Sequence, residues 1–519
     1  MKPYSPVVLT PKIGMIDLYS DKKINKMKRN LLYSILLTSL AFVGCSEEFL
    51  DPQRNTSVLT AEDLSGFSDI NPALVEGTLE GIGSFMIQDF GVTGSRHYDF
   101  GQKGVDIWTD IVSGDMALSG SAYGWYNNTA NLVSTVDFTR EENNIIWEYY
   151  YKIVNLANTV IQTTGGNAGQ PETAAARKIM GQAKASRAYA YYYLAQLFQN
   201  SYDPAQPILP YYDGELTETA KVPASQIYAL VVSDLTEAVE LLDGYARPDK
   251  SKIDKTVAQG LLAYVHAGMG NFAEAKVMAD AVIASGYPVT TAGELAYPGA
   301  GSGFNNVNTP SWVWGFDLTE ELGHQLIDWW GQMDPFTYSY AWAGDHKSID
   351  DGLYAQIAAD DIRKTQFGTG TAALQAIGKF FDPNRVIGGQ YIITTDLVFM
   401  RVEEFYLLSA ESAARTGNEA AAKATMIELL DNRMPNAAST VNALSGAALQ
   451  DFIYLQTQIE MWGEGKTYFA MKRNQASVTR GTNHVYRAGE SFQWDSDEMS
   501  FQIPENEINN NPSISEQNN

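Results

Sequence analysis

The chain has 519 residues, of which 45% are hydrophobic and 12% aromatic, so it can fill a substantial packed core. Its 61 acidic side chains outnumber its 36 basic ones, and the formal net charge at pH 7 is −25. Such a surface repels polyanions, which argues against a nucleic-acid partner. Neutral sugars remain suitable ligands.

Residues 1–44 are predicted to be an export signal. A basic stretch precedes the apolar run Leu31–Val43, and Gly44 and Cys45 follow it. The run is short for a bilayer span, which needs about 20 residues. A small residue followed by cysteine predicts cleavage before Cys45 and lipidation of its thiol. An N-terminal membrane anchor with a chance cysteine is the alternative, and Met27 is an alternative start to Met1.

The residues that follow Cys45 predict where the protein resides. Ser46-Glu47-Glu48 is an acidic start, similar to the surface-export signals of some Gram-negative lipoproteins. We therefore expect an outer-membrane, lipid-anchored protein that faces the cell exterior. Cys45 is the only cysteine, so lipidation leaves no thiol for a disulfide, and stability must come from packing. Without the leader, the chain carries about 30 excess negative charges.

Helical periodicity dominates the chain after the leader, and the helices come in adjacent pairs of tetratricopeptide size. The first predicted pair covers 142–163 and 173–199, and the second covers 223–243 and 255–269. In both pairs, apolar residues recur at helical spacing. The pattern therefore predicts a mostly α protein.

The clearest repeat signal lies in 258–283. Small residues at Ala263, Ala267 and Ala275 allow two helices to approach closely, and Gly270-Asn271 supplies the turn between them. A fourth unit is expected at 400–430, with its turn at Gly417-Asn418. Together these units predict a helical-repeat scaffold of about four pairs over 142–286 and 398–475.

Two long stretches, 84–140 and 287–397, do not look helical and are rich in Gly, Asn, Asp, Trp and Tyr. Because bare loops of that length are rare in compact proteins, we expect them to pack together as an irregular layer that carries the function. A short strand is predicted at 311–316, where Trp312, Trp314 and Phe316 alternate.

Two aromatic clusters in these stretches are candidate ligand sites. Sugar rings stack on aromatic faces while their hydroxyls bind amides and carboxylates, so a glycan site needs exposed aromatic rings with polar neighbours. The predicted ligand-binding residues are Trp125, Tyr126 and Asn128 from the first cluster and Trp329, Trp330, Tyr338 and Trp342 from the second, which also contains Tyr340 and Asp345. Trp147, Trp312, Trp314 and Trp462 are expected to be core residues.

No catalytic or metal-binding pattern emerges from the sequence, and we expect neither an enzyme nor a cofactor. Glu460 and Glu464 lie on one helix face, whereas glycosidases hold two carboxylates on opposite sides of a sugar; these two are expected to pair with Lys466, Lys472 or Arg473. The five histidines lack a zinc-ligand spacing. The segment 495–498 is acidic enough to ligate calcium but lacks the glycine and later glutamate of an EF-hand loop.

Several segments match one known family in their order and spacing. They are Cys45–Asp51, Ala183–Leu194 followed by Pro207–Pro210, the repeat at 258–286, Arg401–Leu408, Glu460–Lys466 and the ending Phe501–Asn509. Through them the chain resembles the SusD and RagB family of outer-membrane glycan-binding lipoproteins. The resemblance covers essentially all of residues 45–519 and implies one SusD-like domain.

The resemblance implies a cell-surface protein that captures oligosaccharide and delivers it to a SusC-like, TonB-dependent transporter in the outer membrane. It also implies a tetratricopeptide-like scaffold beneath an irregular ligand-binding region. Two alternatives remain at this point: a helical-repeat protein that captures peptides or binds another protein, and a polysaccharide hydrolase. The sequence does not specify which glycan is bound.

Overall fold

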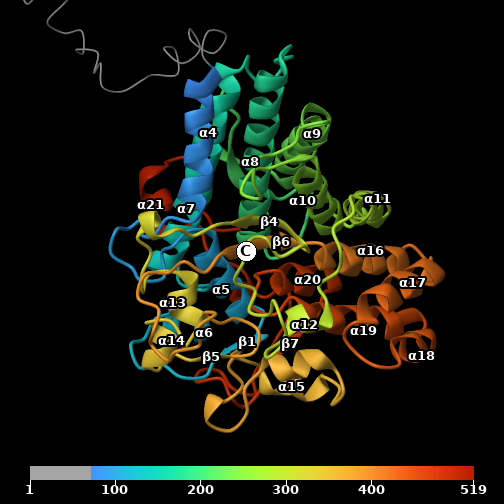
Figure 1. Cartoon of the computed structure of the whole chain (residues 1–519). Coiled ribbons are helices and arrows are strands. Elements are labelled where there is room, and N and C mark those ends of the chain that lie inside the picture. Colours follow the sequence, from blue (N-terminus) through green and yellow to red (C-terminus); the bar gives the residue numbers. More distant parts are fainter. Residues whose placement is uncertain (1–71, 519) are drawn as a thin grey trace, which may run out of the picture. The chain divides into compact units, whose positions relative to one another are not determined.

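The computed structural model describes residues 72–518, and the helices and strands below carry the labels of Figure 1. The predicted export signal and Cys45 lie outside the described residues. Among the helices of 72–518, none combines the length and the apolar character needed to cross a bilayer.

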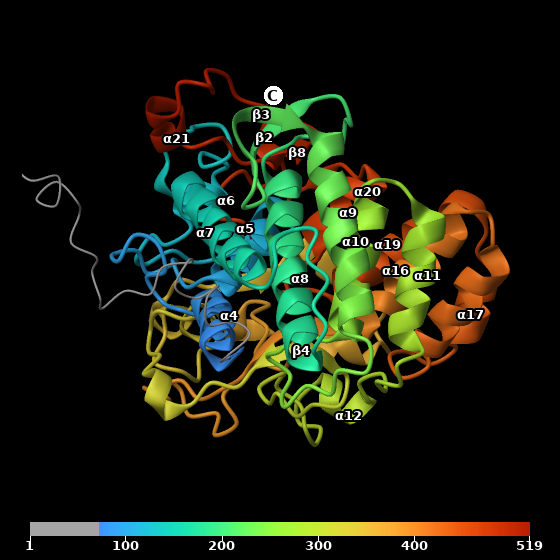
Figure 2. The same ribbon diagram turned by 90° about the horizontal axis from the view of Figure 1, so that it is seen from above.

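The scaffold is a series of antiparallel helices that pack in chain order, as expected for stacked helix pairs. Figure 2 shows α7 to α11 side by side, and α11 packs in turn against α16. The helices predicted within 142–286 and 398–475 are confirmed. Their bounds are α7 (Glu141–Thr163), α8 (Ala174–Leu197), α9 (Ala224–Leu241), α10 (Lys255–Gly268), α11 (Phe272–Ile283), α16 (Glu403–Arg415), α17 (Glu419–Leu430), α18 (Ala437–Asn442), α19 (Gly446–Glu460) and α20 (Thr467–Asn474).

Local sequence explains where these helices begin and turn. The side chain of Asp254 caps α10 by accepting a hydrogen bond from the backbone N–H of Val257, and Thr173 caps α8 in the same way. Gly270 and Gly417 have φ values of 79° and 81° and form the predicted turns between α10 and α11 and between α16 and α17. Close packing also depends on Gly260, where a Cβ would lie 2.5 Å from the Phe405 ring.

Strands are short in 72–518 and form antiparallel pairs. The predicted strand at 311–316 is confirmed as β4, although all five of its residues are buried rather than alternating. Trp312 of β4 pairs with Arg401 of β6, which links the irregular layer to the start of α16. The pairs are β1 (Met116–Leu118) with β5 (Lys347–Ile349), β2 (Pro207–Tyr212) with β3 (Thr217–Pro223), β4 (Trp312–Phe316) with β6 (Leu397–Arg401), and β7 (Val478–Thr479) with β8 (Ser491–Phe492).

The two stretches predicted to be irregular contain more helix than expected. The prediction was wrong for α5, whose eleven residues are all buried, because polar Lys103, Asp106 and Asp110 interrupt its apolar pattern. Short helical turns account for much of the rest. The helices of these stretches are α5 (Gln102–Val112), α6 (Asn127–Ala130), α12 (Ala292–Leu295), α13 (Trp329–Met333), α14 (Tyr340–Ala343) and α15 (Asp351–Gln356), with 3-10 turns at 320–322, 362–366 and 370–372. Outside them and outside the paired helices lie α4 (Pro72–Met86), a 3-10 turn at 497–499 and α21 (Glu505–Asn510).

A buried ion network joins the scaffold to the irregular layer. Glu460 accepts hydrogen bonds from Arg401 at 2.8 Å, Arg433 at 2.7 Å and Arg363 at 3.2 Å. Glu464 accepts from Arg401 Nε at 2.8 Å and from Lys379, also at 2.8 Å. The predicted partners Lys466, Lys472 and Arg473 were therefore wrong, because arginines distant in sequence fold onto this pair.

Candidate functional site

The two predicted aromatic clusters meet in the irregular layer, although about two hundred residues separate them in sequence. Leu118 of β1 pairs with Lys347 of β5, and the backbone N–H of Ser119 continues the pairing to the His346 carbonyl at 2.8 Å. Beyond the strands, the buried carboxylate of Asp345 accepts a 2.7 Å hydrogen bond from the Tyr123 backbone N–H. The segment after β1 is thereby fixed against the segment before β5.

A first aromatic group lies at this junction and consists of Tyr123, Trp125, Tyr340 and His97. Trp125 stacks on the His97 ring, with centroids 5.0 Å apart and an interplanar angle of 19°. Tyr340 contacts Trp125 and Tyr123 edge-on, at 5.9 and 5.3 Å, and its hydroxyl is hydrogen-bonded to His97 Nδ1. Tyr123 is 64% exposed and Trp125 is half-buried, so this group reaches the surface.

A second aromatic group consists of Tyr338, Trp342 and Tyr391, which are 38%, 46% and 56% exposed. Tyr338 lies between the other two, with ring centroids 5.6 Å from Trp342 and 5.3 Å from Tyr391. The sequence predicted Tyr338 and Trp342 but missed Tyr391. Apolar residues in an otherwise polar segment around Tyr391 could have indicated an exposed ligand surface. Val386, Ile387 and Ile392 of this segment are indeed exposed.

Three predicted ligand residues are buried and cannot stack on a sugar in this conformation. Trp329 and Trp330 are only 2% and 1% exposed, because Asp328 caps a helical turn whose five residues all face inward. Trp329 packs edge-on against Phe380 at 4.7 Å. Tyr126 is 1% exposed and lies beneath the first aromatic group, 4.9 Å from Lys347 Nζ. These three are core residues, as the expected core tryptophans also prove to be.

Asn128 occupies an intermediate position. Its side chain is partly buried, and its amide nitrogen donates to Glu142 of scaffold helix α7 at 3.1 Å. The amide therefore joins the short helix α6 to the scaffold.

Burial changes the pKa of two side chains at the first aromatic group. Burial lowers the pKa of His97, so its ring is uncharged near pH 7. Burial also lowers the pKa of Lys347, which lies below the group, to about 7 despite the nearby charge of Asp345. Neutral aromatic faces suit uncharged sugar rings better than they suit ionic ligands.

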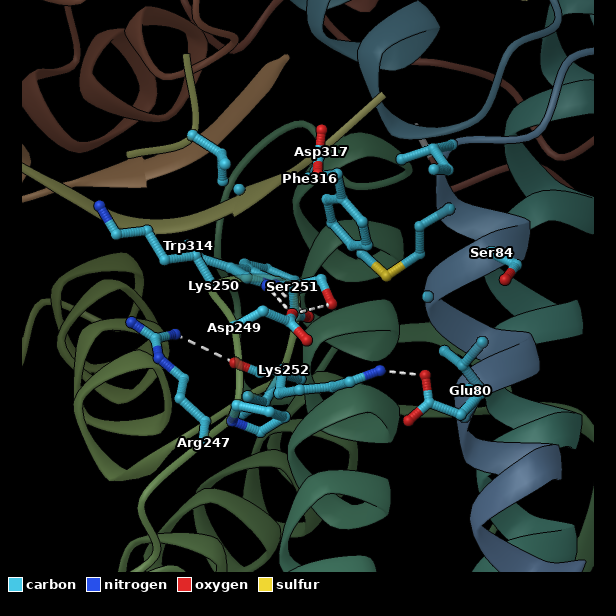
Figure 3. A pocket seen from close by; sticks show the side chains of 18 of the residues that line it. Glu80, Ser84, Arg247, Asp249, Lys250, Ser251, Lys252, Trp314, Phe316 and Asp317 are labelled. Atoms are coloured by element: carbon cyan, nitrogen blue, oxygen red, sulfur yellow. Dashed lines mark hydrogen bonds and ion pairs between the residues drawn. The ribbon is translucent and has the colours of Figure 1, made fainter. Parts of the chain in front are cut away.

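A separate cavity of about 710 Å³ lies between α4, the segment 247–253 and β4. Figure 3 shows Trp314 against Lys250 and Ser251, where its indole nitrogen donates to the Ser251 carbonyl at 3.0 Å, whereas Phe316 lies nearer to α4. Lys252 forms an ion pair with Glu80, and Arg247 donates to the Tyr287 hydroxyl at 2.6 Å. The volume is that of a small-molecule site, and no sequence pattern had pointed to it.

The acidic pair that the sequence offered for catalysis is not exposed. Glu460 and Glu464 are buried within the ion network, at 2% and 3% exposure. Burial tends to raise the pKa of Glu464, but the charges of Arg401 and Lys379 outweigh it and hold the pKa at about 2. Within 72–518, no three His, Cys, Asp or Glu side chains gather closely enough to hold a metal ion. Asp497, from the acidic segment considered for calcium, accepts a hydrogen bond from Asn200 at 2.9 Å.

Two family models match the chain and together cover more than half of it. A model described as "Starch-binding associating with outer membrane" matches residues 96–266, and one described as "SusD family" matches residues 336–519. A SusD-like protein from Bacteroides ovatus is 24% identical over 245 residues, which are 46% of this chain and 39% of that protein. The alignment thus spans less than half of the curated relative.

Solved structures show the same fold. A SusD-like carbohydrate binding protein from Bacteroides vulgatus aligns with a TM-score of 0.70 at 22% identity, covering 85% of this chain and 97% of that one. Surface glycan-binding protein A from Bacteroides thetaiotaomicron aligns with a TM-score of 0.64 at 16% identity, covering 86% and 98% of the two chains. At these identities the likeness establishes the fold alone.

Proposed function

Because this chain belongs to the SusD family, we propose that it captures oligosaccharides at the cell surface on its exposed aromatic groups and does not cleave them. The observation that carries the proposal is that exposed Tyr123 and half-buried Trp125 pack on buried Tyr340, which lies on the same short helix, α14, as exposed Trp342. Trp342 in turn packs with the exposed rings of Tyr338 and Tyr391. Sugar rings bury their C–H faces on such rings.

We further propose that the protein is anchored in the outer membrane through lipidated Cys45, faces the exterior and passes its glycan to a SusC-like, TonB-dependent transporter. Support comes from the signal pattern before Cys45 and from the family. Copurification of the tagged protein with such a transporter, extracted from outer membranes in mild detergent, tests the delivery step. Recovery of the protein without a transporter would contradict it.

Glycan capture is tested by calorimetric titration of the chain, made without its leader and with Cys45→Ser, with neutral oligosaccharides from starch, β-glucan, xylan and mannan. Removal of both rings in the Tyr338→Ala, Trp342→Ala double variant is expected to weaken binding at least about tenfold, because each stacked ring contributes on the order of 1 kcal/mol. Phe138→Ala is the matched control, since Phe138 is 38% exposed but lies beside α21. Equal affinity of the wild type and the double variant would contradict the placement of the site.

A second candidate function is peptide capture, favoured by the exposed aliphatic side chains of Val386, Ile387 and Ile392 beside the second aromatic group. Apolar patches of this kind also bind peptides. Titration with an oligopeptide library distinguishes the two: peptide binding without any glycan binding would replace the first proposal.

A further inference from the structure

A polar pocket of about 390 Å³ borders the second aromatic group and is separate from it. Gln390 lines the pocket and precedes Tyr391, and its carbonyl accepts the Tyr338 backbone N–H at 2.8 Å. The other lining residues are mostly amides, hydroxyls and carboxylates: Asn305, Asn306, Asn308, Asn384, Thr394, Thr395, Asp317, Asp382 and Asp396. These groups match the hydrogen-bonding needs of sugar hydroxyls.

The Asp382 carboxylate of this pocket has hydrogen-bonding capacity to spare. Asp382 is 1% exposed, and its Oδ1 has no hydrogen-bond partner among the described residues. A buried unpaired acceptor costs free energy until a donor reaches it. No Lys or Arg lines the pocket. Within 72–518, no ion pair involves its three carboxylates, Asp317, Asp382 and Asp396.

The polar pocket adjoins the large cavity of Figure 3. Val307, Asn308 and Asp317 line both spaces. Asp396 holds this junction in place, because its carboxylate accepts the backbone N–H groups of Val307 at 2.6 Å and Leu318 at 3.0 Å. Three features therefore follow one another: the exposed aromatic rings, the polar pocket and the cavity beside Trp314.

We propose that these features form one extended binding track for a neutral, hydroxyl-rich oligosaccharide of several sugar units. The aromatic rings stack one unit, Asp317, Asp382 and the pocket amides bind the hydroxyls of the next, and the cavity receives the end of the chain. The uncompensated carboxylates reject sugar units that carry a carboxylate of their own. This inference rests on the proposed glycan binding and adds the length and charge of the ligand.

Chain length tests the track. We expect the affinity for neutral oligosaccharides in the panel above to rise from disaccharide to hexasaccharide, measured by the same titration. Asp317→Ala removes an exposed carboxylate that binds the second sugar unit, so it is expected to weaken the binding of both disaccharide and hexasaccharide about tenfold, since it deletes hydrogen bonds to a charged group. Glu218→Ala, an exposed carboxylate on β3, is the control.

Blocking the cavity gives an independent check. Ser84 is exposed and lies on α4 at the cavity, so Ser84→Trp is expected to reduce hexasaccharide binding but not disaccharide binding. Equal affinities for both lengths, or hexasaccharide binding that neither variant changes, would overturn the track and leave glycan capture intact. Tighter binding of oligogalacturonate than of neutral chains would overturn the charge assignment. If no glycan of any length binds, the proposed function itself fails.

Discussion

The aromatic side chains of the irregular layer fall into two classes, those exposed to solvent and those buried in the core. Trp342 is 46% exposed and Trp330 is 1% exposed, although they lie twelve residues apart in one aromatic segment. Only an exposed ring can bury new apolar surface when a sugar arrives. The same residue type is therefore available to a ligand in one place and belongs to the core in the other.

Replacement of each tryptophan by alanine separates these roles. Trp330→Ala is expected to lower the free energy of unfolding by about 3 to 5 kcal/mol, because it leaves a large cavity in the core. Trp342→Ala is expected to cost less than about 1 kcal/mol while weakening glycan binding. Urea denaturation and titration of both variants check this, and a stable Trp330→Ala protein with reduced affinity would restore Trp330 to the site.

Lys347, which lies beneath the first aromatic group, makes the free energy of unfolding depend on pH. Burial lowers its pKa from the ordinary 10.5 to about 7, so between these values the folded protein binds fewer protons at this site than the unfolded chain. Stability from this group therefore rises with pH above about 7.

The Lys347→Met variant removes this dependence. The free energy of unfolding of the wild type relative to the variant is expected to rise by about 1 kcal/mol per pH unit between pH 7 and pH 9, as urea denaturation at both pH values can measure. Lys152→Met, at an exposed position on α7, should show no comparable slope. A constant difference for Lys347→Met would mean that its ammonium is not desolvated.

At the level of elements, the buried ion network is the main polar connection between α19, β6 and the irregular layer. Arg401 of β6 contacts both Glu460, the last residue of α19, and Glu464 just beyond it. Removing one member of such a network leaves the opposite charges buried and unpaired.

Arg401→Met is accordingly expected to lower the free energy of unfolding by about 3 kcal/mol or more. Arg140→Met is the comparison, because Arg140 forms an exposed ion pair with Asp137 and should cost less than about 1 kcal/mol. Thermal or urea denaturation measures both. A small loss for Arg401→Met would show that the strand pairing and packing, rather than the charges, hold these elements together.

The sequence predicted the elements whose signals are local. Paired helices with glycine turns at Gly270 and Gly417 were found at the expected positions. Helix α5 was missed because it is buried on all sides and carries polar residues that bind other elements, such as Lys103 with the Val398 carbonyl at 3.2 Å. The spacing of apolar residues reveals a helix that has one buried and one solvent-exposed face, whereas α5 has no exposed face.

At the level of the whole molecule, the sequence identified the two segments that meet at the candidate site, but not which of their side chains are buried and which are exposed. The carboxylate of Asp345 brings Tyr123 to the second segment through a contact that no local pattern encodes. The inward turn of Trp329 and Trp330 depends in the same way on tertiary packing. His97, Tyr391 and the polar pocket come from separate parts of the chain, so only the fold brings them together.

The central claim is that the exposed aromatic surface holds glycan without cleaving it. The most direct measurement is mass spectrometry of an oligosaccharide incubated overnight with the wild-type protein at a concentration where titration shows it fully bound. We predict that the oligosaccharide is recovered with its mass unchanged, and that the Tyr338→Ala, Trp342→Ala variant fails to retain it. Shorter products formed by the wild type, or full retention by the double variant, would contradict this account.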